Sequence, residues 1–118
     1  MLAAMTLTLL AGGCRGAKLS DADAQLERGE YFDASKTYRK IYNKLTKREE
    51  RPLRGEVAYK MATCYRKLNM AARASAAYQN AIRYEYPDSM AFLYLGRSLQ
   101  AEGKYAPAMD CLLYTSDA

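Results

Sequence analysis

The alternation of hydrophobic and polar positions after residue 18 predicts six helices and an all-α fold class. Turn signals divide the helices from one another. Gly29 and Gly103 are suited to helix C-termini, and Pro87 ends a third helix. Pro107 fits the first turn of the last helix, where its missing N–H costs little. The expected helices cover residues 19–28, 31–46, 54–69, 71–85, 88–101 and 104–115.

The first thirteen residues form an uncharged, mainly apolar stretch. A helix needs about 20 residues to span a bilayer, so this stretch instead has the length of a signal-peptide core. It leads into Leu10–Cys14 (LAGGC), which resembles a bacterial lipobox, where small residues precede a lipidated Cys. We therefore predict a signal peptide at 1–13 with a truncated start, lipidation of Cys14, and a tether at 14–18. The alternative is a buried apolar helix that ends in Gly12-Gly13.

A similar sequence frame recurs around Ala34, Ala74 and Ala108. The second and third copies lie 34 residues apart, and the first and second lie 40 apart, which leaves a six-residue insertion within 45–53. A period of 34 is that of the tetratricopeptide repeat (TPR). The sequence resembles this family over about 19–114, with repeats at 19–46, 54–87 and 88–114. The resemblance implies a right-handed superhelix of about three helix-turn-helix repeats.

The recurring residues alternate between small and large. Gly or Ala lets two helices cross closely, and a Tyr or Leu fills the space opposite. The residues assigned to repeat packing are Gly29, Tyr31, Ala34, Tyr38, Ala62, Tyr65, Ala74, Tyr78, Ala81, Leu95, Gly96, Leu99, Gly103, Tyr105 and Ala108.

A narrower resemblance rests on segments 29–34, 57–66 and 77–89. They are similar to the N-terminal region of Bacteroidota OmpA-family envelope lipoproteins, a group that includes PorE-type components of type IX secretion. The resemblance implies a TPR module that is lipid-anchored at the periplasmic face of the outer membrane. In those proteins a β-propeller and a peptidoglycan-binding domain follow. Residues 111–118 resemble a translated sequencing adapter, so we expect a fragment with a non-native tail; a natural C-terminus is the alternative.

Composition excludes several kinds of chemistry. The 118 residues include no His, so a Ser-His-Asp triad and a Cys-His pair are impossible. Segment 12–18 lacks the ending of a phosphate-binding loop. Cys64 and Cys111 lack CxxC spacing, which disfavours zinc and favours small buried thiols. We predict no enzymatic activity, cofactor, metal or small-molecule substrate.

The net charge is +5, from 18 basic and 13 acidic residues, and the positive charges are spread along the chain. The one dense basic run, 44–54, also contains Glu49 and Glu50. We interpret this run as a solvated loop rather than a surface that tracks phosphates, and we predict no nucleic-acid partner.

The function should therefore lie in a surface. TPR solenoids bind partners in the concave groove formed by the first helix of each repeat. Arg and Tyr there suit carboxylates or aromatic edges of a peptide segment or chain terminus, although an ordinary solvated face is the alternative. The groove residues transferred from the family pattern are Tyr59, Thr63, Arg66, Lys67, Leu93, Arg97 and Gln100.

Three functions remain open at this stage. The first is a scaffold that docks proteins or peptide segments of an envelope complex and touches the membrane only through its lipid anchor. The second is a subunit of outer-membrane protein assembly. The third is the docking domain of an envelope enzyme whose catalytic part lies elsewhere.

Overall fold

The computed structural model describes the backbone of residues 17–117 and the side chains as far as Leu113. The predicted signal peptide, Cys14 and most of the tether lie outside the described residues. Within them the chain is helical and contains no strand, which confirms the all-α prediction. The α-helices are α2 (Leu19–Glu27), α3 (Tyr31–Lys44), α4 (Arg51–Lys67), α5 (Ala71–Arg83), α6 (Met90–Ala101) and α7 (Tyr105–Asp117), with a 3₁₀ turn, η1 (Arg48–Glu50), before α4.

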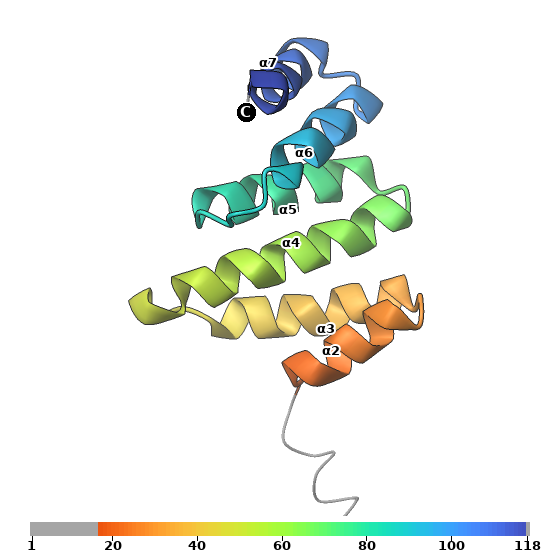
Figure 1. Ribbon diagram of the computed structural model, residues 1–118. Helices are drawn as coiled ribbons and strands as arrows, with labels where there is room; N and C mark the ends of the chain where they lie inside the picture. The colour runs from red at the N-terminus through yellow and green to blue at the C-terminus, as the bar shows by residue number, and fades with distance from the viewer. Residues whose placement is uncertain (1–16, 118) are drawn as a thin grey trace, which may run out of the picture.

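The helices are stacked in the order of the chain, from α2 at one end to α7 at the other (Figure 1). In this described part, extensive packing joins only helices that follow one another in sequence: α2 with α3, α3 with α4, and so on to α7. Three helix pairs result, and they are α2–α3, α4–α5 and α6–α7. This is the nearest-neighbour architecture of a TPR-type helical repeat fold.

The insertion between the first two pairs is more ordered than expected. It was predicted as a loop over 45–53, but it contains η1 and the first turn of α4. The Lys47 backbone N–H donates to Glu50 Oε1 at 3.1 Å, which closes the 3₁₀ turn. Pro52 then occupies the first turn of α4, where a helix has no need of its N–H. The helix therefore begins at Arg51 rather than at Arg54.

Each helix pair is closed by the same backbone turn. Gly29, Asn69 and Gly103 have φ of 76°, 58° and 82°, in the left-handed region. A Cβ on Gly29 or Gly103 would meet no atom within 4 Å, so these positions need a conformation rather than space. Both glycines therefore end a helix, as predicted, and neither makes the close packing contact that was also assigned to it. Glu85 takes the same conformation, with φ of 60°, after α5.

The core is built from small residues that face large ones. Ala34, Ala62, Ala74, Ala81 and Ala108 have no exposed surface. All but Ala81 belong to one core cluster with the equally buried Tyr38 and Tyr78. The closest approach involves Gly96 of α6, where an added Cβ would lie 2.9 Å from Leu112 Cγ in α7. Such contacts let paired helices cross at short range.

One predicted packing residue, Tyr105, does not pack. Its side chain is 70% exposed, and Met109 and Leu113 are 61% and 56% exposed. At four-residue spacing the three form one stripe along α7. In the earlier pairs the next pair covers this face: Ser75, which matches Met109 in the repeat, is buried and donates its hydroxyl to Glu102 at the end of α6. No described helix covers α7 in this way.

The first two pairs are joined by Asp23 of α2. Its carboxylate accepts hydrogen bonds from the Tyr38 hydroxyl in α3 and from Lys60 Nζ in α4, the latter at 3.0 Å. Burial by itself would raise the pKa of Asp23, but these two hydrogen bonds and the charge of Lys60 hold it below its usual value. One side chain thus connects three helices.

The strained turn at Glu85 gives a test of the backbone assignment. Glu85→Gly should raise the free energy of unfolding by about 0.5–1 kcal/mol, because glycine adopts positive φ without the Cβ penalty. Urea denaturation at 25 °C measures the change. Glu27→Gly is the matched control: Glu27 ends α2 with ordinary helical backbone, so this variant should lose a similar amount. Destabilisation by both substitutions would contradict the assignment.

Candidate partner-binding site

The predicted groove residues of α4 lie on one stripe, but two of them are committed to internal packing. The Tyr59 ring stacks on Tyr86 with ring centroids 4.5 Å apart and meets Tyr78 edge-on at 5.6 Å. The Thr63 hydroxyl donates to the Tyr59 carbonyl at 3.1 Å. Burial raises the pKa of Tyr59, so it stays a neutral phenol. Tyr59 and Thr63 therefore stabilise the helix packing beneath the surface and present no charged group to a partner.

Arg66 is held in place by two tyrosines. Its Nε donates to the Tyr78 hydroxyl at 3.1 Å, and its guanidinium carbon lies 4.1 Å from the ring centroid of Tyr94 in α6. The Tyr78 and Tyr94 rings are stacked at 5.8 Å. Burial raises the pKa of Tyr78, and its hydrogen bonds with Arg66 and Thr63 oppose the rise only in part. The arginine is thus fixed by contacts with α5 and α6.

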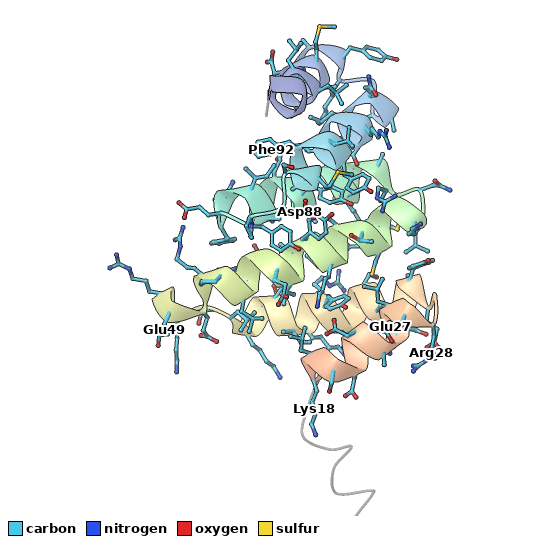
Figure 2. All side chains as sticks on the ribbon, viewed as in Figure 1. Lys18, Glu27, Arg28, Glu49, Asp88 and Phe92 are labelled. Carbon is cyan, nitrogen blue, oxygen red and sulfur yellow. The ribbon has the colours of Figure 1, made fainter. Side chains whose placement is uncertain are left out.

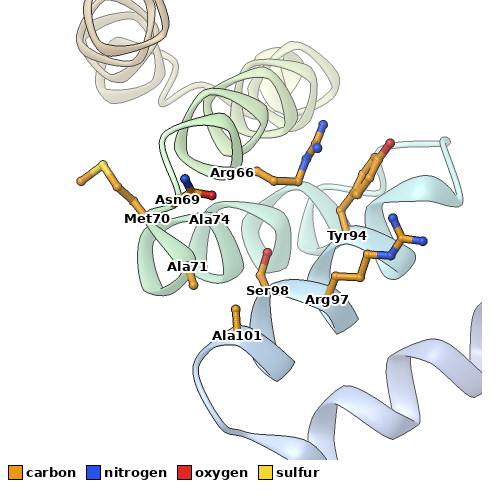
Figure 3. Close-up of a pocket in the computed structure, with 9 residues that line it drawn as sticks. All are labelled: Arg66, Asn69, Met70, Ala71, Ala74, Tyr94, Arg97, Ser98 and Ala101. Carbon is orange, nitrogen blue, oxygen red and sulfur yellow. The ribbon is translucent and has the colours of Figure 1, made fainter.

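A pocket of about 360 Å³ lies beside Arg66, between the end of α4, the start of α5 and α6. Figure 3 shows Arg66 and Arg97 entering it from different helices, with Tyr94 between them. The lining contains two guanidinium groups and no carboxylate, and three alanines leave it open. The lining residues are Arg66, Asn69, Met70, Ala71, Ala74, Tyr94, Arg97, Ser98 and Ala101.

Of the predicted groove residues, the structure brings only Arg66 and Arg97 to this pocket. Lys67 and Gln100 are exposed and Leu93 is half-buried, but none of the three lines it. Neither arginine has a carboxylate partner among the described side chains.

The sequence-based assignment missed Asn69, Tyr94 and Ser98. Tyr94 and Ser98 stand three residues before and one after Arg97, on the same face of α6, so helical spacing could have found them. Asn69 stands where the other repeats have Gly29 and Gly103. At this position Asn69 forms the same left-handed turn and also presents an exposed polar side chain to the pocket.

The arrangement fits recognition of a carboxylate. A guanidinium presents a planar fork of N–H donors that matches two carboxylate oxygens. Arg66 has a fixed position and Arg97 is exposed and adjustable, so a carboxylate between them would meet one rigid and one mobile donor. The Tyr94 ring adds an aromatic face to the same pocket.

The described residues were also searched for other chemistry. Among the described side chains, residues 17–113, no group of three His, Cys, Asp or Glu is placed to hold a metal ion. No disulfide joins Cys64 and Cys111 in the described structure. Burial raises the pKa of Cys64 to about 11, so its thiol is protonated at neutral pH. No helix in the same part of the chain combines the length and apolarity needed to cross a membrane.

The pair that supplies Arg66, Tyr78 and the pocket wall is α4–α5. Residues 56–89 match the tetratricopeptide repeat family. The matched segment covers most of α4, all of α5 and the turn that leads to α6. The pairs on either side repeat the left-handed turn, which extends the TPR-type fold along the described chain. TPR units generally mediate protein–protein interaction. Searches of curated proteins and of solved structures find no match.

The hydrogen bond between Arg66 and Tyr78 can be tested by removing one hydroxyl. Tyr78→Phe should lower the free energy of unfolding by about 1 kcal/mol, because a half-buried guanidinium nitrogen loses its acceptor. Tyr65→Phe is the control, since the buried Tyr65 has no hydrogen-bonded partner for its hydroxyl in the described structure and should change by less than about 0.5 kcal/mol. Equal losses in both variants would show that the bond is not formed.

Proposed function

We propose that this protein is a non-catalytic docking module that binds an acidic peptide segment or chain terminus of a partner protein. The observation that carries the proposal is the pair Arg66 and Arg97 at one pocket without a neutralising carboxylate. Two like charges at one pocket repel each other, and an incoming carboxylate removes that repulsion. The TPR match at residues 56–89 supports a protein as the partner.

Arg66 has a second role in packing, which affects the choice of variant. Its replacement disturbs Tyr78 and Tyr94, so a loss of binding would be ambiguous. Arg97 is exposed and has no stacking or ion-pair partner among the described residues, so Arg97→Glu changes the pocket charge with little effect on the fold.

The test is selection from a displayed peptide library, followed by affinity measurement with acidic peptides and their amidated counterparts. We expect acidic peptides to be enriched, amidation to weaken them, and Arg97→Glu to reduce affinity at least tenfold, or about 1.4 kcal/mol. Arg83→Glu makes the same charge change at an exposed position away from the pocket and should leave affinity within about twofold after correction for salt. Equal effects of the two variants, or no preference for acidic peptides, would refute the proposal.

We further propose that the module works in a bacterial cell envelope. In this proposal Cys14 is lipidated, and the chain is the TPR module of an OmpA-family, PorE-type lipoprotein at the periplasmic face of the outer membrane. Its partners are envelope proteins or peptide segments. The support is the sequence resemblance alone: the LAGGC segment and the similarity at 29–34, 57–66 and 77–89. Firm anchoring needs more than one acyl chain, which bacterial lipoprotein processing supplies.

Labelling with an alkyne fatty acid tests the anchor. Expressed in a bacterium with an outer membrane, the protein should be labelled and should fractionate with that membrane. Cys14→Ser should abolish both label and fractionation, while Cys64→Ser serves as a thiol control that keeps them. Label that persists in Cys14→Ser would overturn the lipidation proposal and leave the docking proposal intact.

A further inference from the structure

A second cationic cluster lies at the other end of α4. Arg51 and Arg54 are three residues apart and so share a helix face. The Arg54 guanidinium lies 4.4 Å from the ring centroid of Tyr42 and 5.0 Å from that of Tyr84, and the Arg51 guanidinium lies 5.1 Å from Tyr84. The two rings meet edge-on at 6.5 Å. Residues from α3, α4 and the end of α5 thus converge on two stacked guanidinium groups.

This geometry departs from the interpretation of 44–54 as a solvated loop at Arg54, while most of the run is exposed. Arg54 is half-buried, and its Nε is fully buried without a hydrogen-bond acceptor in the part of the chain that the structure describes. A buried donor without a partner costs about 1–3 kcal/mol, and more when it is charged. Tyr42 stacks on Arg54 and also forms a side-chain hydrogen bond with it, but this leaves the buried Nε of Arg54 without an acceptor.

The surrounding charges do not neutralise the cluster. The N-terminal end of a helix carries a partial positive charge, and acidic side chains normally stand there. The first turn of α4 has none and instead begins with Arg51. Glu50 Oε1 accepts the Lys47 backbone N–H, and Glu49 is exposed at the outer end of η1 (Figure 2). Neither carboxylate forms an ion pair with Arg51 or Arg54.

We propose that Arg51 and Arg54, oriented by Tyr42 and Tyr84 at the start of α4, form a binding site for a phosphoryl anion. A phosphoryl group has enough oxygens to accept from two guanidinium forks at once. Its charge offsets both arginines and the positive helix end. A single carboxylate would satisfy only one fork.

This site is distinct from the peptide pocket. Arg51 and Arg66 are 15 residues apart on one helix, which is roughly 22 Å. The phosphoryl group can belong to a soluble phosphate or to a lipid headgroup, and the chemistry at the arginines is the same. The experiment therefore has two arms.

Both arms use the full chain with Cys14→Ser, so that no acyl chain contributes. In the first arm, thermal unfolding is followed against pyrophosphate at constant ionic strength. In the second, binding is measured to vesicles of phosphatidylglycerol in phosphatidylcholine, with pure phosphatidylcholine as the blank. Saturable stabilisation by pyrophosphate identifies a soluble ligand, and vesicle binding alone identifies a headgroup.

Arg51→Gln/Arg54→Gln should weaken binding at least tenfold in the arm that responds. Arg48→Gln removes one charge from the same run at an exposed residue without a stacking partner and should change binding less than twofold. If the double variant fails to fold, Arg51→Lys keeps the charge at an exposed position but loses the fork, and should still weaken binding several-fold. No response in either arm, or an equal loss in Arg48→Gln, would overturn the proposal.

Discussion

The buried ring of Tyr78 is the contact on which both the packing of the helices and the pocket beside Arg66 depend. It has no exposed surface and lies where α4, α5 and α6 meet. Tyr59 packs against it from one side and Tyr94 from the other, while its hydroxyl holds Arg66. A phenylalanine would fill nearly the same volume but has no hydroxyl to accept the hydrogen bond from Arg66. The second helix pair is therefore attached to the third through the residue that also positions the pocket.

A single backbone turn, used three times, keeps this arrangement in register. Because Gly29, Asn69 and Gly103 all take positive φ, the two helices of each pair leave the turn in a similar way. Arg66 and Arg97 come from neighbouring pairs, 31 residues apart in sequence, and they line a common pocket although they do not occupy equivalent positions of the 34-residue repeat. The chain can vary the chemistry of the pocket without changing the scaffold.

The helix pairs could be predicted because their signals are local. Glycines and prolines mark the turns, and the 34-residue spacing of Ala74 and Ala108 indicates the repeat. The start of α4 was placed three residues late because Pro52 was not recognised as part of a first helical turn. The packing predicted for Tyr105 failed because burial at that position depends on a following helix, which the repeat pattern does not itself provide.

Only part of the site could be predicted, because local sequence signals do not show contacts between distant residues. The groove pattern of the TPR family identified Arg66 and Arg97, but the surroundings of these two side chains depend on contacts between residues distant in sequence. Tyr94 stacking on Arg66 joins two repeats, and the environment of Arg54 needs Tyr42 and Tyr84 from either side in sequence. A composition-based interpretation of the 44–54 run could not reveal that one of its cations is inserted between two rings.

Among the described residues, the extensive packing of each helix is against its sequence neighbours, and this also determines how the molecule forms and comes apart. Because the main contacts form between segments close in sequence, closing the loops between them costs little entropy. Folding should therefore be rapid. Opening at one end does not remove support from the other, so the stack behaves as a linear array of coupled units. Amide protection from hydrogen exchange should then decline from α4 and α5 toward both ends, a gradient instead of a single cooperative value.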